Sequence, residues 1–484
     1  MTMKKPDFPL PRPLSVSLLL LLTLGACTTP VPYQKPVMDV PVAFKESALW
    51  KTARPDAASV PDEWWQLFND GALNALQAQV AVGNENLKAS AAQVEIARAA
   101  LGSTRAGQSP TLGASAGITT SIAPGATNAA TSNSIAANAS WELDLWGRVS
   151  GTVSGAEARL QASSADLAAA RLSVHALLTQ TYFSLRSAES QAALLERSVT
   201  AFQRSLELTQ NRYAGGVASA ADVAQATTQL RTTQAQLIES HSNRALLEHA
   251  IATLLGKPAA AFSLAKTAVL PDAPVAPLQL PAQLLERRPD IAAAERRVAA
   301  ANALIGVAQS AFFPAITLSA SAGLRGAELL DLISAPNLFW SLGPSLALAL
   351  FDGGARKAAQ ASARANTDLA AANYRQTVLT AFQEVEDNLV TAASLEEQIV
   401  LQTDALTSAQ RNLEITNNQY KAGTVSYLNV VTAQATALSA ERTLLDVRNR
   451  RLTAITLLLK NLGGRWDGKS GLSGRPPSYS KIEP

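Results

Sequence analysis

The side chains that most often carry enzyme chemistry are few in this chain and are not spaced for it. The three histidines, His175, His241 and His249, do not fall at a metal-ligand spacing, and a single cysteine, Cys27, cannot form a disulfide within the chain. We find no phosphate-binding loop, no glycine-rich dinucleotide turn and no serine–histidine–aspartate set. The sequence therefore predicts a protein that is not an enzyme and that uses no cofactor or metal.

Cys27 stands where a covalent modification would be expected. A basic start is followed by an apolar run over residues 14–24, then by small residues and Cys27. The run is too short to span a bilayer and has the length of the apolar part of a signal peptide. This pattern resembles a bacterial lipobox, so we expect residues 1–26 to be removed and Cys27 to be acylated. Because Thr28 replaces the aspartate associated with inner-membrane retention, the expected location is the outer membrane of a Gram-negative bacterium, with the chain extending into the periplasm.

The polar and glycine residues that could form a functional site lie in a stretch that occurs twice. Residues 205–237 and 412–444 align at a spacing of 207, and each has helix-forming sequence on both sides of a short break. Gly216 and Gly423 supply the positive φ that ends an incoming helix, so each stretch predicts a helical hairpin. Two further pairs of segments align at nearly the same spacing, 86–112 with 290–316 and 139–146 with 344–351. The chain is therefore expected to be a tandem duplication.

Each copy has the same expected order of elements: a moderate helix, two alternating segments, a long helix and a return helix. The expected helices are 86–108, 148–213 and 220–255 in the first copy and 290–311, 355–420 and 427–461 in the second. Apolar residues in the long helices alternate at spacings of three and four, which is typical of a coiled-coil seam. About 65 helical residues extend roughly 100 Å.

The alternating segments predict strands, and their surroundings favour a membrane. The segments are 111–120, 135–146, 315–325 and 340–351. Apolar residues alternate with small or polar ones, as in transmembrane β-barrels, although a strand of a soluble sandwich has the same pattern in isolation. Lengths of about ten residues and flanking aromatics such as Trp146 and Trp340 favour the barrel.

Four strands cannot close a membrane barrel, because the smallest closed barrels need about eight. An open edge in lipid leaves backbone N–H and C=O groups unsatisfied, so several chains must pool their strands. Small inward-facing side chains favour a water-filled interior, and hence a channel. The predicted fold is mainly α with a transmembrane β part.

The formal net charge of +3 lies partly in the signal peptide, so no nucleic-acid partner is expected.

The chain resembles the TolC family of outer-membrane channels, and in particular its lipoprotein branch. The motifs that carry the resemblance are Trp64-Trp65, Arg288-Pro289-Asp290-Ile291, Phe313-Pro314, Leu350-Phe351-Asp352-Gly353-Gly354 and the two hairpin tips. The resemblance implies a homotrimer with a twelve-stranded outer-membrane barrel, held in outer-membrane lipid and continuous with a periplasmic helical barrel. It also implies docking of a periplasmic adaptor at the tips and an inner-membrane transporter that supplies the energy for efflux.

The expected domains follow from the duplication and the resemblance. They are the signal peptide 1–26, an acylated proline-rich tether 27–61, a first repeat 62–256 with a β-hairpin at 110–147 and a helical hairpin at 148–255, a linker 257–281 in the equatorial region, a second repeat 282–464 with a β-hairpin at 314–352 and a helical hairpin at 355–461, and a tail 465–484.

The resemblance also implies a gate where the inner helices meet at the periplasmic end. Tyr420 falls on a tip tyrosine of the family, Asp222 on its partner and Leu428 on an apolar constriction position. Asn429 and Thr432 stand where the family often has aspartate rings, so we expect a weaker preference for cations. The gate candidates are Tyr420, Asp222, Leu428, Asn429, Thr432 and Tyr213, and the docking candidates are Gly216, Val217, Ala218, Ser219, Gly423, Thr424, Val425 and Ser426.

Simpler roles and other functions are also consistent with the sequence. Tyr213 and Tyr420 could be large caps of the heptad seams, Asp222 could be the N-cap of its helix, and the tip glycines could serve only the turns. A duct for type I protein secretion would share the fold. A periplasm-spanning lipoprotein without a pore would account for the heptads and Cys27, but not for the four alternating segments.

Overall fold

The computed structural model describes residues 32–46 and 61–462, except 123, 126, 268, 276–286 and 330. Cys27, the predicted signal peptide and the predicted tail therefore lie outside the described residues. The chain divides into two compact units, and each contains segments from both repeats. The first holds Gln93–Ser163 and Ala293–Arg375, and the second holds Met38–Ala92, Ser164–Ala292 and the chain from Gln376 onward. The sequence repeats are thus not the units in which the chain packs.

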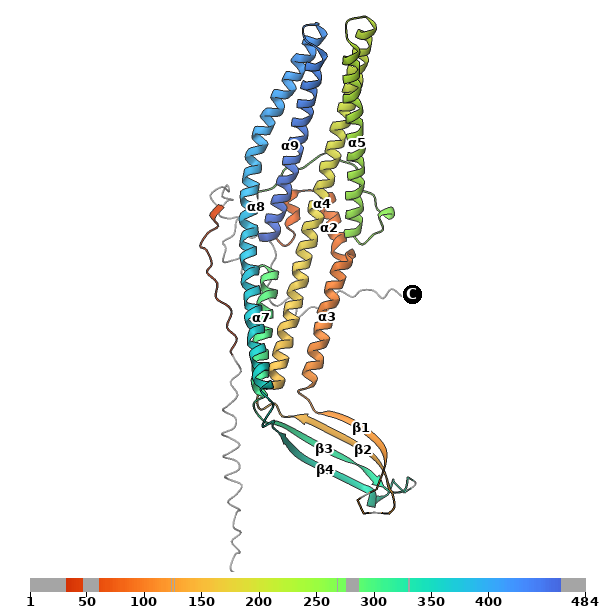
Figure 1. Cartoon of the computed structure of the whole chain (residues 1–484), viewed down its shortest axis with the longest axis vertical. Coiled ribbons are helices and arrows are strands. Elements are labelled where there is room, and N and C mark those ends of the chain that lie inside the picture. Colours follow the sequence, from red (N-terminus) through yellow and green to blue (C-terminus); the bar gives the residue numbers. More distant parts are fainter. Residues whose placement is uncertain are drawn as a thin grey trace, which may run out of the picture. The chain divides into compact units, whose positions relative to one another are not determined.

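The elements follow the duplicated order, with several short helices added (Figure 1). In the first repeat they are η2 (Trp64–Phe68), α2 (Gly71–Gly83), α3 (Glu85–Ala106), β1 (Thr111–Ser121), β2 (Ala130–Glu142), α4 (Arg148–Ala214), α5 (Ala220–Leu254) and η3 (Ala259–Ala261). In the second they are α7 (Pro289–Ser310), β3 (Ala315–Gly326), η4 (Ala335–Asn337), β4 (Leu338–Ala347), α8 (Ala355–Lys421) and α9 (Tyr427–Leu462). The short elements η2, α2, η3 and η4 were not predicted.

The four predicted strands form one antiparallel sheet in the order β1-β2-β3-β4. The central pair joins the two repeats, with a register that runs from Asn133 opposite Gly326 to Glu142 opposite Thr317. A side chain on Gly323 would meet the carbonyl oxygen of Ile135 at 2.2 Å, so glycine permits a close approach of β2 and β3. β1 and β4 are the two edges of this sheet.

The predicted C-terminal ends of two strands were wrong. β2 stops at Glu142 and β4 at Ala347, before Trp146 and Phe351, respectively. Aspartates in the intervening turns instead cap the long helices. Asp144 accepts hydrogen bonds from the backbone N–H groups of Val149 and Ser150 at 2.9 and 2.6 Å, and Asp352 does the same for α8. Satisfying the first N–H groups of a long helix outweighs the alternating pattern at these positions.

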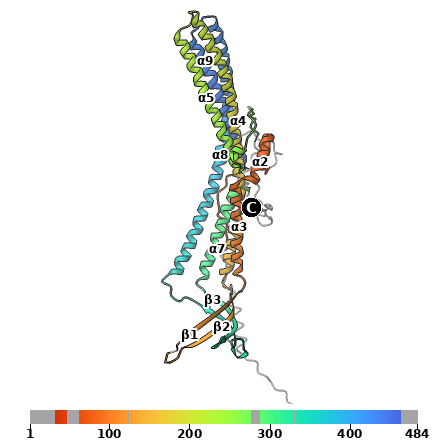
Figure 2. The ribbon, with the colours of Figure 1, turned by 90° about the vertical axis from the view of Figure 1, so that its right-hand side faces the viewer.

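The second unit is held together by the heptad seams of α4 and α8. Leu178, Leu185 and Leu195 of α4 are buried, as are Val385 and Leu395 of α8. The return helices α5 and α9 contact one another, and Figure 2 shows them with the C-terminal parts of α4 and α8. None of the described helices combines the length and hydropathy needed to cross a membrane.

Candidate gate at the hairpin tips

Both hairpin turns have the same backbone geometry. In the first, Gly216 has φ of 72°, and Val217 and Gly216 donate to the carbonyls of Arg212 and Tyr213 at 2.8 and 2.9 Å. In the second, Gly423 has φ of 77°, and Thr424 and Gly423 donate to the equivalent carbonyls at 3.0 Å. This paired pattern satisfies the last carbonyls of α4 and α8 and requires a residue that tolerates positive φ. The tips are therefore tight, well-defined turns.

Asp222 is committed to the start of α5. Ser219, not Asp222, is the N-cap, and the two residues form a capping box. The Asp222 carboxylate accepts from the Ser219 backbone N–H at 2.9 Å, while the Ser219 hydroxyl accepts from the Asp222 N–H at 3.2 Å. The N-cap role considered for Asp222 is thus corrected to the third helical position, where an acidic residue completes the box.

The two tip tyrosines, equivalent in sequence, lie in different environments. Tyr420 is buried and packs edge-on against Tyr427, with ring centroids 5.4 Å apart. Tyr213 is 52% exposed in this chain, so the simpler alternative of a seam cap does not hold for it in the single subunit. The seam of α4 ends instead with Phe202, Leu206 and the contacts of Arg212. Tyr420 and Asp222 are not joined by a hydrogen bond, since the Tyr420 hydroxyl has no partner among the described residues.

Arg212 is a tip residue that the sequence did not single out. Its Nη1 donates to the carbonyl of Tyr420 at 2.9 Å, and its guanidinium lies 4.6 Å from the centre of the Tyr420 ring. Tyr427 also contacts α4, because its hydroxyl lies 3.1 Å from the Ser205 hydroxyl of α4. Ser205 and Arg212 are seven residues apart and so share one face of α4. In the sequence, Arg212 could have been noticed as a candidate from this seven-residue spacing and from its place next to Tyr213, which aligns with Tyr420 in the second repeat.

The remaining candidates lie on exposed parts of the tips. Leu428, Asn429 and Thr432 occupy an exposed face at the start of α9, and the Thr432 hydroxyl donates to the Leu428 carbonyl at 2.9 Å. This face presents an apolar side chain, an amide and a hydroxyl, with no formal charge. Among the docking candidates, Gly216, Val217, Ser219, Gly423, Thr424 and Ser426 are exposed, while Ala218 and Val425 are half-buried.

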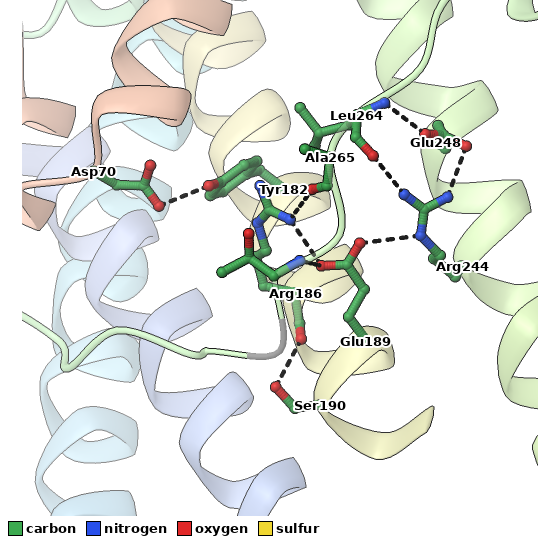
Figure 3. A network of polar contacts seen from close by, with 10 residues as sticks. Asp70, Tyr182, Arg186, Glu189, Ser190, Arg244, Glu248, Leu264 and Ala265 are labelled. Atoms are coloured by element: carbon green, nitrogen blue, oxygen red, sulfur yellow. Dashed lines mark hydrogen bonds and ion pairs between the residues drawn. The ribbon is translucent and has the colours of Figure 1, made fainter. Parts of the chain in front are cut away.

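A buried ion-pair network lies further along the first hairpin (Figure 3). Arg186 and Glu189 of α4 are almost fully buried and pair at 2.7 Å. Glu189 also accepts from Arg244 Nε of α5 at 3.0 Å, and Arg244 pairs with Glu248 at 2.8 Å. Although burial raises the pKa of Glu248, its hydrogen bonds to the Leu264 N–H and to Arg244 bring that pKa below its ordinary value.

This network fixes the start of the linker between the repeats. The carbonyls of Ala265 and Leu264 accept from Arg186 and Arg244 at 2.8 and 2.7 Å, and the Thr267 N–H donates to Glu189 at 3.0 Å. Tyr182 extends the network by donating to Asp70, the N-cap of α2, at 2.7 Å. Burial and this hydrogen bond raise the pKa of Tyr182 to about 12. The network thus joins α2, α4, α5 and the start of the linker within the second unit.

The ends of α2 and α5 make a backbone contact beside this network. A Cβ on Gly256, which has φ of 69°, would lie 2.2 Å from the Gly83 carbonyl oxygen. A Cβ on Gly83 would lie 2.3 Å from the carbonyl of Leu255. Asn84 bridges the same two ends by donating to the Leu254 carbonyl at 2.7 Å.

Comparison with known proteins matches this architecture to one family. The family described as "Outer membrane efflux protein" matches residues 76–257 and 280–464. The chain belongs to this family. The efflux-family match falls in two segments that follow the duplication. The structure of the outer-membrane channel OprN superposes with a TM-score of 0.84 at 29% identity, covering 90% of this chain and 99% of that one.

Two curated members of the efflux family align with nearly the whole chain. Outer membrane protein OprJ of Pseudomonas aeruginosa is 31% identical over 477 residues, which are 96% of this chain and 97% of that protein. The probable outer membrane lipoprotein SilC of Salmonella typhimurium is 30% identical over 462 residues, covering 93% of this chain and 98% of that protein. The predicted fold class and outer-membrane location are confirmed. The alternative of a lipoprotein without a pore was wrong, because the chain is an outer membrane efflux protein.

Proposed function

We propose that this efflux protein is a homotrimer anchored through acylated Cys27, in which three sheets close one twelve-stranded barrel and six hairpin tips form a periplasmic gate. A periplasmic adaptor docks on the tips, and an inner-membrane transporter supplies both substrate and energy. The channel itself conducts passively. The tether, the two repeats and the linker keep the boundaries given by the sequence.

The observation that carries this proposal is the open sheet. β1 and β4 are edges, and a lipid-facing edge leaves backbone groups without partners. Their equivalents in two further copies would satisfy these groups and remove every edge. Leu112 and Ile118 on β1, and Trp340, Leu342 and Leu346 on β4, are exposed in one chain, as lipid-facing residues would be.

The tips are the part of the second unit best suited to a gate and a docking site. Their turns are tight and hydrogen-bonded, and exposed Val217 and Leu428 offer apolar surface. The names of two relatives favour efflux or export: OpmQ of Pseudomonas aeruginosa is named for pyoverdine export, and a TtgC protein of Pseudomonas putida is named for toluene efflux. Efflux is therefore favoured over protein secretion for this chain.

The first test is single-channel conductance of the purified protein in a planar bilayer, together with its mass in detergent. We expect a trimer with a small, flickering conductance, because a gate at the tips restricts a wide barrel. A monomer or dimer that does not conduct would overturn the proposed assembly and the gate together.

A second test addresses the chemistry of the constriction. Changing Thr432→Asp is expected to raise the preference of the channel for cations, because three added carboxylates would line a neutral ring. The matched control is Thr432→Asn. Asparagine has nearly the same shape as aspartate but no charge, so this variant should keep ion selectivity near that of the wild type. Reversal potentials under a KCl gradient measure the effect. Equal selectivity of the two variants would place Thr432 outside the conducting path.

A further inference from the structure

One positive charge joins the two helical hairpins of a subunit at their tips. Arg212 stands in the last turn of α4, and its Nη1 reaches the carbonyl of Tyr420 in the last turn of α8. That carbonyl also accepts from the Gly423 N–H at 3.0 Å. Carbonyls at a helix C-terminus carry partial negative charge and favour a cation, so the guanidinium meets α8 where its attraction is strongest.

The same guanidinium contacts the Tyr420 ring. At 4.6 Å from the ring centroid, the separation is within the range of a cation–π interaction, which strengthens as the ring is removed from water. The Tyr420 side chain is buried among Phe202, Leu206 and Tyr427. Arginine can stack and donate at once because its guanidinium is planar, whereas lysine offers a single point charge.

These contacts link α4 to both helices of the second hairpin. Arg212 holds Tyr420 at the end of α8, Tyr420 packs on Tyr427 at the start of α9, and Tyr427 meets Ser205 of α4. One face of α4 therefore fixes both sides of the second turn. Displacing α8 or α9 at the tip breaks either the Arg212 contacts or the Tyr427–Ser205 contact.

The sequence repeat shows that this arrangement is specific to the first hairpin. The residue equivalent to Arg212 in the second repeat is Gln419, which is neutral. Asp222 cannot replace the arginine contact without leaving its capping box with Ser219. The Tyr420 hydroxyl, which would be needed for a bond to Asp222, has no partner in the described part of the chain.

We propose that Arg212 is the positioning residue of the closed gate, acting on Tyr420 through its ring and its backbone carbonyl and not through its hydroxyl. This inference rests on the proposed gate at the tips. Loss of the guanidinium leaves the second turn held to α4 only by the Tyr427–Ser205 contact and the apolar packing, and shifts the tips toward an open arrangement.

The test compares purified full-length variants in planar bilayers. Arg212→Met keeps side-chain length but removes the charge, and we expect the ratio of open to closed dwell times to rise about tenfold or more, since a hydrogen bond to a charged donor is lost. Arg212→Lys is expected to lie between this variant and the wild type. Arg204→Met removes the same charge from an exposed position on α4 and should gate like the wild type.

Two substitutions at Tyr420 separate the ring from the hydroxyl. Tyr420→Leu removes the ring and should open the channel nearly as much as Arg212→Met. Tyr420→Phe keeps the ring and the carbonyl and should open it much less. In the double variant Arg212→Met with Tyr420→Leu, the two effects should fall well short of multiplying, because both remove one interaction.

The outcomes separate a failure of the Arg212 proposal from a failure of the proposed channel and gate. A conducting trimer in which Arg212→Met gates like Arg204→Met would overturn the role of Arg212 and leave the channel proposal intact. Equal opening by Tyr420→Phe, Tyr420→Leu and Asp222→Asn would instead assign closure to a Tyr420–Asp222 bond. A wild-type protein that neither forms trimers nor conducts would overturn both proposals. Trimer mass and helical circular dichroism are recorded for every variant, and Arg212→Lys supplies the comparison if Arg212→Met does not assemble.

Discussion

Replacing Glu189 with glutamine is expected to destabilise the protein by about 3–5 kcal/mol, the usual cost of breaking a buried ion pair from one side. Both carboxylate oxygens are used: one accepts from Arg244, and the other from Arg186 and the Thr267 N–H. An amide can present only one acceptor, so its NH₂ group must face an N–H donor whichever way it turns. Arg186 and Glu189 are 4% and 3% exposed, so water cannot compensate.

The duplicated sequence provides a matched control for this variant. Glu396, the equivalent residue 207 positions later, pairs with Arg451 at 3.2 Å, but its side chain is 46% exposed. We expect Glu396→Gln to cost about 1 kcal/mol or less, because water shares the charge. Thermal unfolding of the detergent-solubilised protein, followed by circular dichroism, compares the two. Equal losses would mean that the network around Glu189 contributes no more than a surface pair.

Replacing Gly256 with alanine is expected to cost about 3 kcal/mol or more, from two sources. The residue has φ of 69°, where an L side chain is strained, and the new Cβ would lie 2.2 Å from the Gly83 carbonyl oxygen. Because that neighbour is backbone, relief requires α2 and α5 to separate. Such movement would also weaken the bond from Asn84 to the Leu254 carbonyl.

Gly216→Ala measures the strain of a positive φ alone, without the clash of the added Cβ. Gly216 has nearly the same φ, 72°, and nothing lies within 4 Å of the added Cβ. Its cost should therefore be about 1–2 kcal/mol, the penalty of a left-handed residue alone. The difference between the two variants, measured by the same thermal unfolding, gives the steric cost of a methyl group at the α2–α5 contact. If both lose the same stability, that contact tolerates a methyl group.

The long-range order of the fold could be read from the sequence because it is repeated. The heptads of α4 and α8 and the alternation in β1–β4 each persist over many residues, so local errors average out. Ends were less predictable: Trp146 and Phe351 continue the alternation, yet aspartates just before α4 and α8 turn the chain into a helix. The pairing of β2 with β3 and the short helix α2 depend on contacts between distant residues, which periodicity does not encode.

The tip shows a different limit of sequence reasoning. Its glycines are local features whose positions were predicted, whereas the cap of α5 was assigned to Asp222 although Ser219 is the N-cap. The difference between Tyr213 and Tyr420 is not local, because it depends on which helix each ring meets. The partner of Arg212 could not be identified from the sequence, since Tyr420 lies 208 residues away and meets Arg212 only because α8 packs beside α4. Network residues such as Glu189 and Arg244 are likewise joined only by the packing of α4 against α5.

The open edges of the four-stranded sheet have a genetic consequence. In the proposed ring, β1 of one subunit must pair with β4 of the next, so a chain with a damaged edge strand spoils a seam that it shares with an intact neighbour. If wild-type and damaged chains are made in equal amounts and mix freely, only about one ring in eight contains three intact chains. Edge-strand alleles should therefore be dominant over the wild type, whereas alleles that prevent the chain from folding at all should be recessive.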